Sequence, residues 1–392
     1  MLAALGLIEP DGRLLRAGEL LLSAPDRPGH PQVVYQYRAT PAGEPRAVER
    51  LEAPLLLAYE RIMDLVSARR NLTPLNLPGG QQLQLEDFPE LAVREALTNA
   101  IIHRDHRLAD PVVIEHSPTL FSITSPGPLV SGVTLENILT HRSKPRNPAL
   151  ARAARLLGIA EEVGRGVDRM YREMIRSGRD VPRIEGDFDE VRVSLAGTAP
   201  DTHVARYVAT LPDSERDDTD AMLVLLYLLR RRTVTAQDVA PVLQRDPDQA
   251  ETVLRRLESP GVRMLEPTRQ TAGRRRPTYR LTEEVLKDLG TRGGPSTPGG
   301  TSRSPPSPPG SRHSLRNWLV VGSAQVFHGA ARQGSRAGRS PRPRPASRAW
   351  TMAWLRCVAC SFPRIVVTLL ATVFADKCRR VPISALLRPA AR

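Results

Sequence analysis

The sequence predicts an α/β protein made of a two-layer α/β sandwich, a unit of three helices with a β-hairpin, and a C-terminal tail without a core. Between residues 85 and 197, short strand-like segments alternate with segments that carry apolar residues at helical spacing. Residues 220–290 contain three apolar helical patterns and then two short strand-like segments. Beyond residue 290, Pro, Ser, Arg and Gly dominate, a composition typical of chains that bury too little apolar surface to fold.

The net positive charge of the chain comes entirely from this tail. The whole sequence carries a formal net charge of +14, but residues 291–392 contain 17 of its 56 Lys and Arg and only one of its 42 Asp and Glu. Residues 1–290 are therefore close to neutral, and the overall charge does not indicate a nucleic-acid partner for them. The tail resembles either a disordered basic segment or an artefactual translation of GC-rich DNA in an unselected frame, and we favour the second interpretation.

Cysteine usage and hydropathy predict a cytoplasmic protein without a membrane partner. All three cysteines lie in the tail, so no disulfide framework holds residues 1–290 together. The first residues lack the basic flank and the small-residue cleavage site of a signal peptide. The longest apolar run near the end, residues 365–375, is too short to cross a bilayer.

The N-terminal segment, residues 1–84, is predicted to be mixed α/β. Residues 32–38 alternate like a strand, residues 54–69 have apolar side chains at helical spacing, and residues 83–88 form a further short strand. We interpret this segment as the remnant of a preceding domain together with the first elements of the sandwich, whose core we place at 85–197.

A helix over residues 89–103 carries the first candidate site residues. Glu95 and Asn99 are four positions apart, so their side chains lie on one face of the helix, one turn apart. A carboxylate can accept a proton from water, and an amide oxygen one turn away can ligate a Mg²⁺ ion that bridges phosphates. The alternative is a solvent-facing pair without a role, which is common on helices.

Two glycine-containing segments accompany this helix. Ser125 and Gly127 begin a turn that continues to Gly132, where a ligand could approach the backbone. Gly164, Arg165 and Gly166 come directly before a predicted helix, whose free N–H groups could bind phosphate oxygens. Turns and helix caps explain each segment equally well on its own, but the combination with the Glu–Asn helix is specific.

Four segments together resemble the "RecG C-terminal-like" family of ATP-binding proteins, which belongs to the broader GHKL, or Bergerat-fold, ATPases. The segments are EALTNAIIHRD (95–105), ITSPGPLVSGV (123–133), RNP (146–148) and GIAEEVGRGVDRM (158–170). The resemblance extends over about residues 5–195. It implies a GHKL-type two-layer sandwich with ATP and Mg²⁺ as ligands. It also implies that a Schlafen AlbA-like domain often precedes this region, and most of such a domain is not in this sequence, which indicates a short variant or a start codon farther upstream.

The resemblance assigns roles residue by residue. Glu95 matches the catalytic base and Asn99 the Mg²⁺ ligand. Gly127 falls in the first glycine box, Gly164 and Gly166 fall in the second with Arg165 between them, and residues 132–146 match the lid over the phosphates.

The chain departs from the family pattern at one position. GHKL enzymes usually place an Asp that reads the adenine amino group just before the first glycine, and Ser125 and Pro126 stand there instead. Serine can form a hydrogen bond but supplies no carboxylate. We expect no catalytic role for His103-Arg104-Asp105, with Asp105 capping the helix end and Arg104 solvated.

Residues 198–219 are polar, acidic and Pro-containing, which predicts a linker. The helices and hairpin over 220–290 resemble a winged helix-turn-helix, whose third helix would enter a DNA major groove while the wing contacts phosphates. The candidate DNA-binding residues are Arg245, Arg255 and Arg256 on or beside the third helix, and Arg269, Arg274, Arg275 and Arg276 on the wing. The alternative is a small unit that only contacts protein.

The sequence therefore predicts an ATP-binding, DNA-binding transcriptional regulator that contacts DNA through 220–290. The alternative is a weak Mg²⁺-dependent ATPase coupled to DNA processing. A helicase motor is excluded because the sequence has no G-x-x-x-x-G-K-[ST] segment. A homodimer is compatible with either interpretation.

Overall fold

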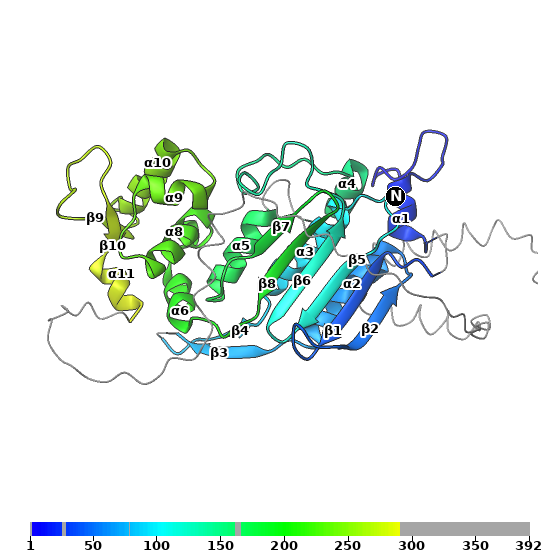
Figure 1. Ribbon diagram of the computed structural model, residues 1–392, viewed down its shortest axis with the longest axis horizontal. Coiled ribbons are helices and arrows are strands. Elements are labelled where there is room, and N and C mark those ends of the chain that lie inside the picture. Colours follow the sequence, from blue (N-terminus) through cyan, green and yellow to red (C-terminus); the bar gives the residue numbers. More distant parts are fainter. Residues whose placement is uncertain (1, 26–28, 78, 161–165, 291–392) are drawn as a thin grey trace, which may run out of the picture. The chain divides into compact units, whose positions relative to one another are not determined.

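The computed structural model describes residues 2–25, 29–77, 79–160 and 166–290 (Figure 1). The predicted tail, 291–392, and the predicted site residues Gly164 and Arg165 lie outside the described residues. No helix in the described ranges is long and apolar enough to cross a membrane.

The described residues form helices and strands at most of the predicted positions and also at positions that the sequence did not predict. The first half comprises α1 (Arg16–Leu22), β1 (Val33–Arg38), β2 (Pro45–Leu51), α2 (Leu55–Ser67), β3 (Leu72–Asn76), β4 (Gln82–Glu86), α3 (Glu90–His103), β5 (Val112–Ser117) and β6 (Leu120–Pro126). The second half comprises α4 (Pro148–Leu156), α5 (Gly166–Arg176), β7 (Arg183–Gly186), β8 (Glu190–Ala196), α6 (Thr202–Thr210), α7 (Asp213–Arg216), α8 (Thr219–Arg230), α9 (Ala236–Leu243), α10 (Pro247–Glu258), β9 (Leu265–Pro267), β10 (Tyr279–Leu281) and α11 (Glu283–Asp288).

A six-stranded mixed sheet of order β2-β1-β5-β6-β8-β7 is the centre of the α/β region. Strand β1 pairs in parallel with β5, and the other neighbours pair antiparallel. Strands β1 and β2 come from the N-terminal segment, so residues 33–51 belong to the same sheet as the strands of 112–196. The strand predicted over 83–88 is instead β4, which pairs with β3 in a separate two-stranded sheet.

Side chains alternate between the two faces of the sheet, as its pleat requires. Helices cover one face of the sheet (Figure 1). Val112 and Ile114 of β5 lie on one face of the strand and are almost fully buried. Glu115, the next residue after Ile114, points to the other face, where it forms an ion pair with Arg38 at 3.2 Å. The sheet therefore has one apolar face under helices and one polar face, which is a two-layer arrangement.

The helix with the candidate residues, α3, ends against the RNP segment. Asn147 occupies the N-cap position of α4, but its side chain makes no cap hydrogen bond there. Its amide Nδ2 donates to the backbone oxygens of Ile102 and Arg104, both at 2.8 Å, and Arg146 Nε donates to the oxygen of His103 at 2.8 Å. Asn147 and Arg146 thus satisfy carbonyl groups that the last turn of α3 leaves open.

Two expectations for the segment after α3 are wrong. Arg104 is buried, not solvated, and donates to the oxygens of Leu108 and Asp110. Asp105 does not cap the helix: its carboxylate accepts from the backbone and side chain of Arg107, and its own N–H donates to the oxygen of Pro126. Asp105 thereby joins the end of α3 to the end of β6.

Residues 202–216, predicted as part of a linker, instead form α6 and α7. Asp201 caps α6 by accepting from two backbone N–H groups, and Val204 and Val208 are buried in a core shared with α5 and α8. Helix α6 was not predicted because this amphipathic helix has only nine residues and lies within a segment, 198–219, that is polar in composition.

Three helices and a hairpin follow as predicted, and α11 closes the described chain. Asp218, Thr235 and Asp246 cap α8, α9 and α10 with their side chains. Strands β9 and β10 pair antiparallel, and Val234 adds an isolated bridge to Tyr279. One continuous cluster of buried side chains joins α5, α6, α8, α9, α10 and the hairpin.

Candidate functional site

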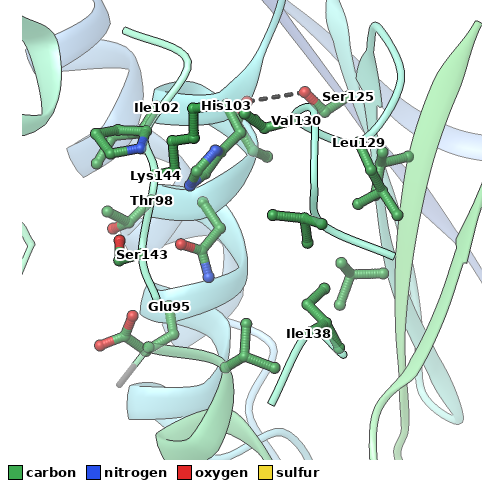
Figure 2. A pocket seen from close by; sticks show the side chains of 18 of the residues that line it. Glu95, Thr98, Ile102, His103, Ser125, Leu129, Val130, Ile138, Ser143 and Lys144 are labelled. Atoms are coloured by element: carbon green, nitrogen blue, oxygen red, sulfur yellow. Dashed lines mark hydrogen bonds between the residues drawn. The ribbon is translucent and has the colours of Figure 1, made fainter. Parts of the chain in front are cut away.

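A cavity of about 280 Å³ lies between α3, strands β6 and β8, the loop 127–145 and the first turn of α5. Figure 2 shows Glu95 and His103 of α3 on one side and Leu129 and Ile138 on the other. Its apolar lining includes Ile123 and Val193. An apolar cavity with a few polar groups at one wall is typical of small-molecule sites.

Glu95 and Asn99 both line this cavity, as their spacing predicted. The Oε1 of Glu95 accepts from Arg169 Nη1 at 3.2 Å, so a side chain of α5 orients the carboxylate. Only about one eighth of the Glu95 side chain is exposed, against one fifth of Arg169. The pair is therefore largely withdrawn from solvent, where hydrogen bonds to charged groups are stronger than at the surface.

Gly166 brings the start of α5 against these two residues. A Cβ at this position would lie 2.5 Å from Glu95 Oε2 and 3.5 Å from Asn99 Nδ2. At the shorter distance the Glu95 carboxylate would have to move, so glycine permits the arrangement seen here. The structure thus brings Gly166, Glu95 and Asn99 together, while their predicted partners Gly164 and Arg165 lie outside the described residues.

Ser125 and Gly127 form the opposite end of the cavity wall. The Ser125 hydroxyl donates to the backbone oxygen of Ala100 at 2.8 Å, which ties β6 to α3. Gly127 has φ of +99°, a conformation that side chains disfavour, and a Cβ there would lie 2.8 Å from Asp105 Cβ. Both residues line the cavity, so the first glycine segment is part of the same site.

Gly132 does not line the cavity itself. It stands between Val130 and Val133, which do, and has φ of +92° at the start of the predicted lid. Asn137 organises this loop, because its side chain accepts from the N–H of Thr134 at 2.8 Å and donates to the oxygen of Gly132 at 3.0 Å.

Several charged residues of the cavity were not singled out in the sequence. His141, Arg142 and Lys144 come from the loop 127–145, and Arg155 comes from α4. The predicted lid range already contained the first three, so the run of basic residues within 141–144 was an available signal. Asp168 and Arg169 of α5 also line the cavity. Basic side chains next to a helix N-terminus favour an anionic ligand.

His103 lines the cavity as a neutral imidazole. Burial, assisted by the positive charge of Arg146, lowers the pKa of His103 to about 4. The ring therefore carries no charge near pH 7 and adds a hydrogen-bonding group, not a cation, to the wall. We retain no catalytic role for it.

The residues present fit a Mg²⁺–nucleotide ligand in chemical type. No group of three or more His, Cys, Asp or Glu that could hold a metal by itself occurs within the residues that the structure describes. Glu95 and Asn99 supply one carboxylate and one amide oxygen, and Mg²⁺ characteristically combines one or two such ligands with waters and phosphate oxygens.

The candidate DNA-binding arginines fall into two groups. Four are ion-paired within the protein: Arg245 with Asp220 at 3.0 Å, Arg255 with Glu251 at 3.0 Å, Arg256 with Asp218, and Arg276 with Asp248. Within the part of the chain that is described, Arg269, Arg274 and Arg275 form no ion pair, and all three are exposed on the segment between β9 and β10. The segment between the strands therefore presents more available positive charge than α10.

Comparison with known proteins bears on the family of the α/β region. Residues 110–195 match the family described as "Putative ATP-dependent DNA helicase recG C-terminal". The crystal structure of the DIP2311 protein from Corynebacterium diphtheriae is similar, with 27% sequence identity and a TM-score of 0.64 over 74% of this chain. The match spans 58% of that protein. Among curated proteins, none is significantly similar to this chain. The match over 110–195, with β5, β6 and β8 in a mixed α/β sheet, supports a RecG C-terminal-like, ATPase-type family for this chain.

Proposed function

We propose that this protein binds ATP with Mg²⁺ in the cavity between α3 and α5 and uses it to regulate DNA binding by its C-terminal unit. The observation that carries the proposal is the approach of Gly166 to Glu95 and Asn99 at the wall of a 280 Å³ cavity. Asn99 would ligate the metal, and Glu95 would face a water at the same wall. The N-terminus of α5, with Arg142 and Lys144, would meet the phosphates.

The bound Mg²⁺ would neutralise phosphate charge. Residues of the chain itself would orient the groups, accept the proton and exclude water. Arg169 orients the Glu95 carboxylate, so this group is positioned to accept a proton from a water. The apolar wall formed by Ile123 and Val193 would exclude water from the rest of the cavity. Ser125 already donates its proton to Ala100, so its oxygen keeps lone pairs that can accept from a base amino group.

Gly166→Ala tests the nucleotide proposal with little risk to the fold. Alanine is the better helix former, and Gly166 does not have positive φ, so α5 should keep its stability. The added methyl group displaces either the Glu95 carboxylate or the start of α5. We expect the affinity for MgATP, measured by calorimetric titration of the full chain, to fall by at least about tenfold.

Gly261→Ala is the matched control, because a Cβ at Gly261 would meet no atom within 4 Å. It should bind MgATP like the parent protein. Equal affinity of the Gly166→Ala variant and the parent would exclude this cavity wall as the nucleotide site. Absence of MgATP binding by the parent would refute the proposed function itself.

A working ATPase is the second candidate, and the orientation of Glu95 by Arg169 favours it. A protein that only senses ATP needs the phosphate and base contacts but no positioned proton acceptor. Whether the nucleotide is hydrolysed therefore separates a regulator with a binding site from an ATPase coupled to DNA processing. The family name refers to a helicase, but this sequence has no Walker-type phosphate loop of a helicase motor.

We further propose that α8, α9, α10 and the β9–β10 hairpin act as a winged helix-turn-helix on DNA. The capped order of three helices followed by a hairpin supports this interpretation. The available charge lies on the wing, so we assign phosphate contacts mainly to Arg269, Arg274 and Arg275. A unit of this kind could also serve only for protein contacts or for a homodimer.

Replacing Arg274 and Arg275 together with Ala should weaken DNA binding without changing sequence preference, because phosphate contacts position a protein but do not read bases. Each lost contact should also reduce the slope of log affinity against log salt by about one. Arg276 is held by Asp248, so adding Arg276→Ala should change the slope by less than one further unit. The measurement is a salt titration of the full chain on a selected and on a scrambled duplex.

The tail is common to all these variants, so it cancels in the comparison. Identical affinities of the double variant and the parent at every salt concentration would remove the wing from the interface. Absence of DNA binding by the parent protein would instead favour the protein-contact interpretation.

A further inference from the structure

Hydrogen bonds of Gln244 fasten the loop that lines the cavity to the turn between α9 and α10. Gln244 follows α9 and has φ of +54°, which is unusual for a residue other than glycine. Its side-chain Oε1 accepts from the N–H of Leu139 at 2.7 Å, and its Nε2 donates to the oxygen of Leu135 at 2.8 Å. Its backbone oxygen accepts from the Thr140 hydroxyl at 3.2 Å.

These three hydrogen bonds bracket a residue of the cavity wall. Ile138 lies between Leu135 and Leu139 and points to the cavity from the side opposite α3 (Figure 2). The Nε2 and the Oε1 of Gln244 are both hydrogen-bonded to the backbone of the loop. The loop therefore cannot shift without breaking these bonds or moving the turn. The position of Ile138 is thus fixed by a residue of the C-terminal unit.

Apolar packing joins the same two regions. Leu139 packs against the buried cluster that joins α5, α6, α8, α9, α10 and the hairpin. Val167 and Ile184, which line the cavity, pack against that cluster too. Protein interiors are close-packed, so a displacement at the cavity is passed to the neighbours instead of being absorbed.

We propose that Gln244 is a positioning residue that couples the cavity loop 135–140 to the α9–α10 turn, so that a nucleotide in the cavity and the conformation of this turn influence each other. The inference rests on the proposed function for its ligand, but the fastening itself does not require one. Coupling free energies are reciprocal, so whatever shifts the turn changes nucleotide affinity by the same factor.

The test uses Gln244→Asn. Asparagine tolerates positive φ better than most residues, so the end of α9 should stay intact, but the amide is one methylene too short to reach the loop. The matched control is Gln249→Asn, an exposed position on α10 with the same chemical change. Thermal midpoints of both variants should remain near that of the parent, which separates a positioning role from a loss of fold.

The first measurement is hydrogen exchange of the full chain without nucleotide. The amides of Leu139 and of the flanking loop residues should exchange faster in Gln244→Asn than in the parent or in Gln249→Asn, because the Leu139 N–H loses its acceptor. Unchanged exchange in this loop would overturn the inference, whether or not the protein binds ATP.

The second measurement is a MgATP titration followed by exchange in the turn. We expect the affinity to fall about tenfold in Gln244→Asn, since bonds of this kind are each worth a factor of several. MgATP should slow exchange at residues 243–249 in the parent and not in the variant. Equal affinities and equal protection in both proteins would overturn the coupling. If the parent binds no MgATP, the proposed function fails, and the loop exchange alone decides the role of Gln244.

Discussion

Glu95→Gln is expected to lower Mg²⁺-dependent ATP hydrolysis by about 10² to 10⁴-fold while the affinity for MgATP changes by no more than about threefold. Glutamine keeps the shape of the side chain and one oxygen that can accept from Arg169 Nη1, but a carboxamide cannot take a proton from water. The substitution therefore removes the base and leaves the cavity wall. Single-turnover hydrolysis and equilibrium binding, measured on the same preparation of the full chain, separate the two effects.

Glu90→Gln is the appropriate control, because Glu90 lies on the first turn of the same helix and is exposed. It should hydrolyse ATP like the parent protein. Turnover that stays the same in Glu95→Gln would show that another group activates the water. No measurable hydrolysis in the parent, together with tight MgATP binding, would favour the regulator over the ATPase.

Local periodicity in the sequence was enough to predict that Glu95 and Asn99 lie side by side. The four-residue spacing of Glu95 and Asn99 places both on one helical face whatever surrounds the helix, and both line the cavity. Gly127 was recognisable for a similar reason, since a sharp break after a strand needs positive φ. The spacing of residues in the sequence could not predict which side chain or backbone group each of these residues contacts.

Contacts between distant segments account for most of what the sequence did not predict. Arg169 reaches Glu95 from a helix 74 positions later, and Gln244 reaches Leu139 across 105 positions. Asn147 has the sequence position of an N-cap, yet its side chain bonds to α3 because the open carbonyls there compete for it. Local sequence preference predicts which residue type stands at such a position, but tertiary packing determines the group to which its side chain bonds.

Charge was similarly misleading when it was counted along the chain. Arg245, Arg255 and Arg256 form a basic group in sequence, but each meets a carboxylate in the fold. An arginine that already pairs with Asp or Glu must break that pair before it neutralises a phosphate. The expected DNA contacts therefore move from the third helix to the wing, a distinction that no count of arginines could make.

Acidification is expected to destabilise the folded protein steeply between about pH 6.5 and about pH 4. Burial lowers the pKa of His103, His106 and His116 to about 4, against about 6.5 for an exposed histidine. The unfolded chain therefore takes up protons before the folded chain does as the pH falls. The stability that these three neutral imidazoles preserve is fully present above about pH 6.5 and is lost progressively down to about pH 4.

A smaller effect has the opposite sign. Burial, together with the neighbouring Asp64, raises the pKa of Glu60 to about 7, so protonation of this carboxyl favours the folded state as the pH falls from about 7 to about 4.5. One pKa unit corresponds to about 1.4 kcal/mol, and three histidines outweigh one partly exposed glutamate. A net loss on the order of 3–5 kcal/mol is expected, which is a large share of the stability of a typical domain.

Urea unfolding of the full chain at several pH values from about 7 to about 4.5 measures this loss, and His116→Asn identifies its source. His116 is almost completely buried, and its Nδ1 is hydrogen-bonded to the Tyr35 hydroxyl at 2.7 Å. An asparagine amide at this position can replace the imidazole as the hydrogen-bond partner of Tyr35. The variant should be less stable at about pH 7, yet its stability should depend less on pH than that of the parent. His30→Asn, at an exposed position, should leave the pH dependence unchanged. If the free energy of unfolding of the parent stayed constant across this range, the three imidazoles would have to be accessible to protons in the folded state, and the neutral His103 at the cavity wall would have to be abandoned.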